Sequence, residues 1–257
     1  MNRQENFIAL ETIVRKEVTR FTRIWTQTLL PPVITQTLYF VIFGKFIGSQ
    51  IGGIAGISYM AFIVPGLVMM AIITNSFANV VSSFFGAKFQ RSIEELLVSS
   101  TPNWMILAGY VSGGILRGVV VGTLVFIVSF FFTQPHVHHP FLIILFMVLT
   151  SALFSLGGFI NAIFAKRFDD VAIFPTFVLT PLTYLGGVFY SIHSLPEFWQ
   201  RLSQLNPILY MVNGFRFGFY GISDVNVLAS ILILIVLIIA ITMYSLMLLN
   251  RGTGLKS

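Results

Sequence analysis

The feature that most constrains this chain is a series of six long apolar stretches that contain almost no charged residues. They cover residues 25–47, 58–85, 104–132, 141–165, 171–190 and 225–250. The hydrocarbon core of a bilayer is about 30 Å thick, and about 20 apolar residues in a helix cross it. Each stretch is long enough, or nearly so, for one crossing. We therefore expect an all-α integral membrane protein with six transmembrane helices.

The composition agrees with this class and excludes several others. Apolar residues make up 56% of the chain and charged residues 9%, whereas a soluble domain carries about 25% charged residues. Six crossings and the short loops between them use nearly all of the 257 residues and leave no room for a separate catalytic or nucleotide-binding domain. The net charge of +6 is not gathered on one soluble face, so we expect no nucleic-acid partner. Cysteine is absent, which excludes disulfides and thiolate chemistry.

Lysine and arginine are distributed unevenly between the loops. One side of the predicted bundle collects Arg3, Arg15, Lys16, Arg20, Arg23, Lys88, Arg91, Lys166, Arg167, Arg251 and Lys256. The other side holds Lys45, Arg201 and Arg216. Because basic loops stay in the cytoplasm, we predict a multi-pass protein with both termini cytoplasmic.

Residues 1–24 precede the first stretch and have an amphipathic pattern. One helical stripe is apolar and consists of Phe7, Leu10, Val14, Val18 and Phe21. We expect a helix along the cytoplasmic membrane surface, which serves equally well as a plain anchor or as a surface for a cytoplasmic partner. Pro31 and Pro32 remove two backbone donors early in the first crossing and predict a bend there.

The loop at residues 86–103, which we call the connector, differs from every other loop. Its sequence is GAKFQRSIEELLVSSTPN, in which Ile93, Leu96 and Leu97 are apolar and the charged side chains have helical spacing. Pro102 stops this helix before the third crossing. The pattern alone favours a capped helical connector over a knob that docks into another protein.

Two features lie inside the third crossing. Gly114, Gly118 and Gly122 have strict four-residue spacing, which favours close helix packing over a functional role. Arg117 lies near the middle of the same stretch, and an intramembrane arginine faces protein or water. No acidic residue lies deep in any stretch, so backbone carbonyls, a tyrosine hydroxyl or a snorkelling pose remain open as its partner.

Two segments on the outer side of the predicted bundle have an unusual composition. His136, His138 and His139 are clustered as zinc ligands can be, but no carboxylate or cysteine is near, and we expect no metal site. Residues 191–224 are too apolar for a solvated loop and too short and polar for two crossings. We expect short re-entrant helices there, buried in protein or lining water.

The chain lacks the motifs of an enzyme or a motor. It has no G-x-x-x-x-G-K-[ST] loop, no H-E-x-x-H helix and no G-x-S-x-G elbow. It also lacks the intramembrane carboxylates that an ion-driven carrier needs. We therefore expect neither an enzyme nor a bound cofactor.

Two segments carry a family resemblance. Residues 174–221 read FPTFVLTPLTYLGGVFYSIHSLPEFWQRLSQLNPILYMVNGFRFGFYG, and residues 84–99 read FFGAKFQRSIEELLVS. Both resemble ABC-2 type transporter permeases, and the resemblance runs from about Arg15 to the C-terminus. It implies one transmembrane domain over residues 1–257, with the bundle at 25–250, in a bacterial inner membrane.

The resemblance also implies partners and their contact sites. A six-helix half-transporter of the type V exporter kind pairs with a second copy and docks on a separate ATPase subunit, which binds ATP and Mg. The connector would be the coupling helix, and its contact residues would be Phe89, Gln90, Arg91, Glu94 and Glu95. The amphipathic helix at 1–24 would be the connecting helix.

The implied translocation path lies at the dimer interface, between membrane lipids, and is lined by the first, second and fifth crossings. Candidate lining residues are Thr74, Asn75, Phe77, Asn79, Phe177, Thr180 and Tyr184. The cargo stays open among lipids, glycans and drugs. The alternative is a non-transporting membrane scaffold that tethers an ATPase or an assembly complex.

Overall fold

The computed structural model describes residues 3–50, 52–54, 56–99 and 101–254. Lys256, counted above among the cytoplasmic basic residues, lies outside them. Within these residues every named element is a helix, and the one exception to helix and loop is an isolated β-bridge between Ile54 and Ile57. The expected all-α class is confirmed.

Five helices are long and apolar enough to cross a membrane in the part of the chain that the structure describes. The first, Trp25–Ile47, is composed of α2 (Trp25–Thr28), α3 (Leu30–Tyr39) and the π-helical η1 (Phe40–Ile47). The others are α4 (Tyr59–Phe89), α6 (Asn103–Ser129), α7 (Pro140–Phe164) and α12 (Val227–Arg251). Each begins and ends within a few residues of a predicted stretch.

The fifth predicted stretch is helical over a shorter length. It consists of α8 (Phe168–Phe174), the π-helical η2 (Pro175–Leu179) and α9 (Thr180–Tyr184), which have seven, five and five residues. At 1.5 Å per residue they span about 25 Å, slightly less than a hydrocarbon core. The helix ends before residue 190 because Gly187 takes a φ of +72°, which breaks the helical path.

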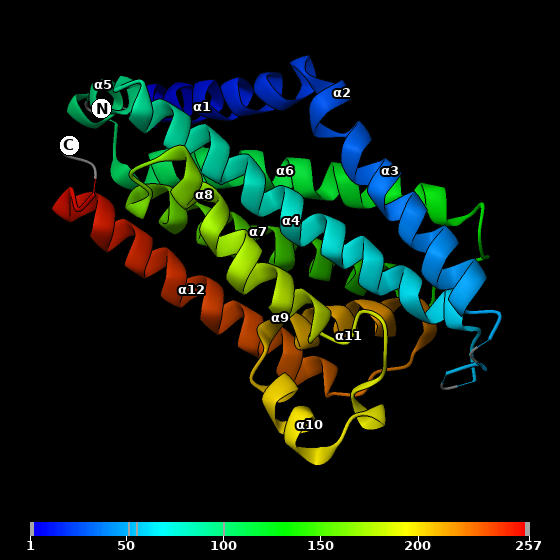
Figure 1. Cartoon of the computed structure of the whole chain (residues 1–257). Coiled ribbons are helices and arrows are strands. Elements are labelled where there is room, and N and C mark those ends of the chain that lie inside the picture. The colour runs from blue at the N-terminus through cyan, green and yellow to red at the C-terminus, as the bar shows by residue number, and fades with distance from the viewer. Residues whose placement is uncertain (1–2, 51, 55, 100, 255–257) are drawn as a thin grey trace.

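The bundle is built around α4, which packs against α6 and α7 (Figure 1). In the apolar window of α4, 89% of residues are buried, whereas the value for α12 is 11%. The predicted glycine stripe of α6 explains the close packing. A Cβ at Gly118 would overlap Ser76 of α4 and Ser151 of α7, and Gly122 lies against Ile72 of α4. Only small residues permit this approach of backbones.

The bundle has two distinct ends (Figure 1). The start of α1 (Arg3–Arg23), α5 (Ser92–Val98) and the end of α12 gather at one, which we call the inner end. The other, the outer end, carries η3 (Ile192–Ser194), α10 (Glu197–Gln204) and α11 (Pro207–Tyr220). The segment 191–224 therefore forms short helices, as expected.

Candidate functional site

The central helix α4 leaves one narrow face open. Thr74, Ala78 and Ser82 are exposed at four-residue spacing, and we call them the open stripe. The exposed side chains of α12 are large and apolar, as at Leu232 and Ile239. In membrane proteins, small and hydroxylated residues are enriched at contacts between helices rather than against lipid. The open stripe is thus the part of α4 that suits a partner, water or cargo.

A groove runs between the open stripe and the segment α8–η2–α9. It encloses a volume of about 350 Å³ and is almost entirely apolar. Its lining residues are Thr74, Phe77, Ala78, Val81, Ser82, Val171, Ala172, Pro175, Leu179 and Thr180. Three of the candidate path residues, Thr74, Phe77 and Thr180, therefore line one cavity. Phe77 itself is 1% exposed and stacks on Phe174 at 5.5 Å.

The other four candidate path residues lie elsewhere. Phe177 is 73% exposed, and the hydroxyl of Tyr184 meets that of Tyr39 on α3 at 3.2 Å. Asn75 and Asn79 are buried and face neighbouring helices, where each accepts a hydrogen bond from an arginine. The structure places these two amides inside the bundle of the single chain.

The partner of Arg117 is the bend of the first crossing. Its Nη2 donates to the carbonyl oxygen of Thr28 at 3.2 Å and to Oδ1 of Asn75 at 3.1 Å. In an unbroken helix the N–H of residue 32 would bond to the Thr28 carbonyl, but Pro32 has no N–H. Arg117 therefore satisfies an acceptor that the proline leaves free, which is one of the alternatives left open by the sequence.

The connector presents a polar edge. Phe89, Gln90, Arg91, Glu94 and Glu95 are all exposed. Beneath them Ile93 of α5 is 1% exposed and anchors the helix. Arg91 turns the chain with a φ of 60°, a left-handed conformation that costs a non-glycine residue about 1 kcal/mol or more.

The base of the connector is held firmly against its neighbours. Nζ of Lys88 donates to the carbonyl oxygens of Ile163 and Ala165 at 2.5 and 2.8 Å and so caps the end of α7. The ring of Phe89 packs edge-on against Phe168 at 4.8 Å. The connector is thus held at its base to the end of α7 and to α8, directly after the last turn of α4.

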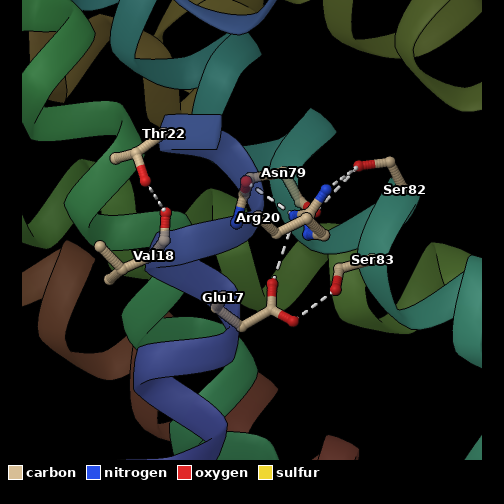
Figure 2. A network of polar contacts seen from close by, with 7 residues as sticks. All are labelled: Glu17, Val18, Arg20, Thr22, Asn79, Ser82 and Ser83. Carbon is tan, nitrogen blue, oxygen red and sulfur yellow. Dashed lines mark hydrogen bonds and ion pairs between the residues drawn. The ribbon is translucent and has the colours of Figure 1, made fainter. Parts of the chain in front are cut away.

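A polar network that the sequence reading missed joins α1 to α4 (Figure 2). Glu17 is fully buried, and its carboxylate accepts from Ser83 Oγ at 2.5 Å and pairs with Arg20 at 3.2 Å. Arg20 also donates to the carbonyl oxygen and to Oδ1 of Asn79, at 2.9 and 2.8 Å. We call this network the inner anchor. Its position shows that α1 lies against the bundle.

The packed face of α1 differs from its predicted apolar stripe. Of that stripe only Phe21 is buried, and Phe7 is 68% exposed. The buried face carries Ile13, Glu17 and Phe21 at four-residue spacing, and Ile13 and Glu17 lie against Gly109 and Gly113 of α6. The sequence signal for this face was Glu17, which lies between two apolar residues at four-residue spacing. A hydrophobic-periodicity argument counts Glu17 as polar and therefore assigns it to the exposed face.

A second buried arginine fixes the loop after α9. Arg216 of α11 is 1% exposed, and its Nη2 donates to the carbonyl oxygen of Gly187 at 2.7 Å. Its guanidinium lies 3.8 Å from the ring centroid of Phe62 on α4, and Nε donates to the Phe62 carbonyl oxygen at 3.4 Å. We call these contacts the outer anchor.

The outer-end histidines make structural contacts. The backbone N–H groups of His138 and His139 both donate to the carbonyl oxygen of Gly218, at 3.1 and 2.7 Å. The ring of His139 stacks on Phe217. Among the described residues, no group of three or more His, Cys, Asp or Glu side chains has the arrangement of a metal site.

The chain is similar to known transport proteins over most of its length. The model of the ABC-2 type transporter family matches residues 8–220. The "Inner membrane transport permease YadH" of Escherichia coli (strain K12) is 59% identical over 251 residues, which cover 98% of each chain. "Nodulation protein J" of Rhizobium leguminosarum bv. viciae is 23% identical over 232 residues, 88% of this chain and 90% of that protein.

Proposed function

The chain belongs to the ABC-2 type transporter family, and from this premise we propose that it is the membrane half of an ATP-driven exporter that acts as a homodimer. It is a multi-pass inner-membrane transport permease and not itself an ATPase. A separate ATPase subunit, with its ATP and Mg, supplies the energy. The chain converts the closure of that subunit into movement of its own helices.

The observation that carries this proposal is the continuity of α4 with the connector. The most buried helix of the bundle runs unbroken over 31 residues and ends directly in an exposed, polar, anchored edge. A push on that edge is delivered to the centre of the bundle, because packed helices move as discrete bodies. The inner end is then cytoplasmic, with both termini on that side.

The groove along the open stripe supports transport rather than a scaffold role. A tether needs only the docking edge, whereas this chain also exposes a small-residue face and a cavity between α4 and α8–η2–α9. In the proposal, α8–η2–α9 is the fifth of six crossings, and the second copy closes over the open stripe. The segment 191–224 re-enters the outer leaflet.

Charge reversal on the connector tests the proposal. The double variant Glu94→Lys/Glu95→Lys should reduce co-purification of the ATPase subunit by about tenfold or more, because like charges replace the matched contact across the interface. The exposed Glu197 of α10, at the opposite end, provides the matched control. Glu197→Lys should leave co-purification unchanged.

Two results would contradict the proposal. Unchanged assembly of the connector variant removes these carboxylates from the interface. Labelling of the connector from the outer side of the cell removes the interface altogether, since no cytoplasmic ATPase then reaches it.

A further inference from the structure

Four aromatic side chains meet above the outer end of the groove, and we call them the outer aromatic cluster. They are Tyr39 of α3, Phe43 of η1, Tyr184 of α9 and Phe189 of the following loop. The ring of Phe189 is central, with centroid distances of 4.7 Å to Phe43, 5.7 Å to Tyr184 and 6.2 Å to Tyr39. The hydroxyls of Tyr39 and Tyr184 meet at 3.2 Å.

The cluster spans the open face of α4. Figure 1 shows α3 and α8–α9 on opposite sides of α4, and the cluster joins them. The groove below it ends at Thr74, Leu179 and Thr180. Tyr184 lies one helical turn beyond Thr180, which is about 6 Å further toward the outer end. The cluster therefore lies across the outward continuation of the groove.

One side of the cluster is fixed. The hydroxyl of Tyr59 on α4 donates to the carbonyl oxygen of Phe189 at 3.2 Å, and the outer anchor holds Gly187 two residues earlier. Between them Val188 packs on Gly66 of α4, where a Cβ would lie 2.7 Å from the Val188 carbonyl oxygen. These contacts hold Phe189 against the central helix.

The other side of the cluster adjoins two π-helical segments. Tyr39 directly precedes η1, and Tyr184 ends α9, which directly follows η2. A π-helix is rare and frequently occurs at a functional site. Both tyrosines thus adjoin irregular helical segments, whereas Phe189 is held directly against α4.

We propose that the outer aromatic cluster is the closure of the transport path toward the outside. Phe189 stays in place against α4, and the side chains of Tyr39 and Tyr184 move apart when the path opens outward. This inference rests on the proposed function, because it takes the groove along α4 as the path. In the structure described here the closure is shut.

Cysteine accessibility tests the closure without knowledge of the cargo. This chain contains no cysteine, so Thr74→Cys in the groove introduces its only thiol, and labelling is read on this chain alone. Right-side-out vesicles that hold the assembled transporter are treated with a membrane-impermeant cationic methanethiosulfonate. With the closure intact, labelling from outside should be slow.

Variants of the cluster should raise that labelling rate in a defined order. Phe189→Ala removes three ring contacts and should raise it by about tenfold or more. Tyr184→Phe keeps the ring and removes one hydrogen bond, so a rise of about two- to fivefold is expected. The conservative variant keeps the test valid if Phe189→Ala folds poorly.

Matched controls separate opening from general loosening. Phe141, 73% exposed at the start of α7, is an aromatic residue outside the cluster, and Phe141→Ala should leave the Thr74→Cys rate unchanged. A thiol at Glu197→Cys, where the native charged side chain is 88% exposed, should react equally fast in every background. Equal rates at Thr74→Cys with and without the cluster variants overturn the closure.

Inside-out vesicles distinguish the two proposals. If Thr74→Cys reacts from the cytoplasmic side but the cluster variants leave outer labelling unchanged, the closure is wrong and the path stands. If it reacts from neither side in any background, the groove is not a path, and both the path and the closure are overturned.

Discussion

The two anchors on α4 hold a neighbouring segment to the same helix by different chemistry. The inner anchor is an ion pair, in which the charge of Glu17 is balanced by Arg20 and by a hydrogen bond from Ser83, while Arg20 also donates to Asn79. The outer anchor has a buried cation, Arg216, that bonds to neutral carbonyls and an aromatic ring. None of the salt bridges among the described residues includes Arg216.

This difference in chemistry indicates which of the two anchors tolerates substitution of its side chains. A balanced pair can be replaced as a unit by apolar side chains, because both desolvation costs disappear together. A cation satisfied by backbone carbonyls and by the neutral amide of Asn213 has no salt-bridge partner to remove with it, and its loss leaves those acceptors unpaired. The outer anchor should therefore be the less replaceable of the two.

The largest expected effect comes from breaking the inner pair. Arg20→Ala leaves the fully buried Glu17 without its cation and should lower the free energy of unfolding by about 3–5 kcal/mol. The double variant Glu17→Met/Arg20→Met should recover more than half of that loss. Denaturant unfolding in mild detergent measures both. A double variant as unstable as Arg20→Ala would contradict the description as a balanced pair.

The stability lost when Arg216 is removed from the outer anchor should not be recovered by a second substitution. Arg216→Ala leaves the Gly187 carbonyl without its donor and should cost about 1–3 kcal/mol. Asp224 is the nearby acid, but its Oδ2 is occupied by Ser191 Oγ and the Ile192 N–H. Adding Asp224→Asn should therefore increase the loss. If Asp224→Asn instead recovered stability, the outer anchor would also be an ion pair, and the two anchors would not differ in chemistry.

Glycines beside the two anchors sharpen the comparison. A Cβ at Gly66 would lie 2.8 Å from the Val188 Cα, and one at Gly113 would lie 2.5 Å from the Glu17 Cβ. Either alanine variant should cost about 1–3 kcal/mol through overpacking. Gly86 of α4 has no atom within 4 Å of a built Cβ, so Gly86→Ala should stabilise the protein by about 0.5–1 kcal/mol. Thermal unfolding of the three variants compares them, and equal shifts would contradict the packing described.

The smallest effect concerns a carboxylate at the inner end that is not buried. The N–H groups of Lys166 and Arg167 donate to Asp170, and these bonds hold the pKa of its carboxyl below the ordinary value. A carboxyl whose pKa is lowered by folding stabilises the fold at pH values above that pKa. Asp170→Asn should therefore slightly lower the stability of the protein, by an amount that is constant from about pH 5 to 8. The difference from the parent should vanish as the pH falls below about 4. Unfolding temperatures measured as a function of pH check this. A loss of stability that grows as the pH falls would contradict a stabilising role of the ionised carboxylate.

The sequence correctly predicted long helices in five of its six apolar stretches, because hydropathy reports directly on whether a helix can cross a bilayer. The five long helices follow the predicted stretches, and the glycine stripe of α6 packs as expected. The bend at Pro31 and Pro32 follows from the missing N–H groups. A backbone carbonyl was among the alternatives for the partner of Arg117 because no acidic residue lies deep in any stretch, and the structure identifies it as the carbonyl of Thr28.

Other features depend on information that apolar periodicity lacks. Apolar periodicity does not distinguish a helix face that contacts lipid from one that contacts protein. For this reason the apolar stripe of α1 was identified, but the face that packs against the bundle was not. The buried carboxylate of Glu17 needs, besides Arg20, a hydrogen bond from Ser83, which lies 66 residues later in the chain. Asn75 and Asn79 carry polar side chains on α4 in the same way as Thr74, and only the packing shows that they face arginines.

The inner anchor also sets an order of events during synthesis. Translation delivers α1 before α4 and α6 exist, so Glu17 leaves the ribosome long before the hydroxyl and the glycine surface that receive it. A lone carboxylate does not enter hydrocarbon readily. The first helix to be made must therefore remain among water and lipid headgroups until the third crossing has been inserted, and it is among the last to reach its final position.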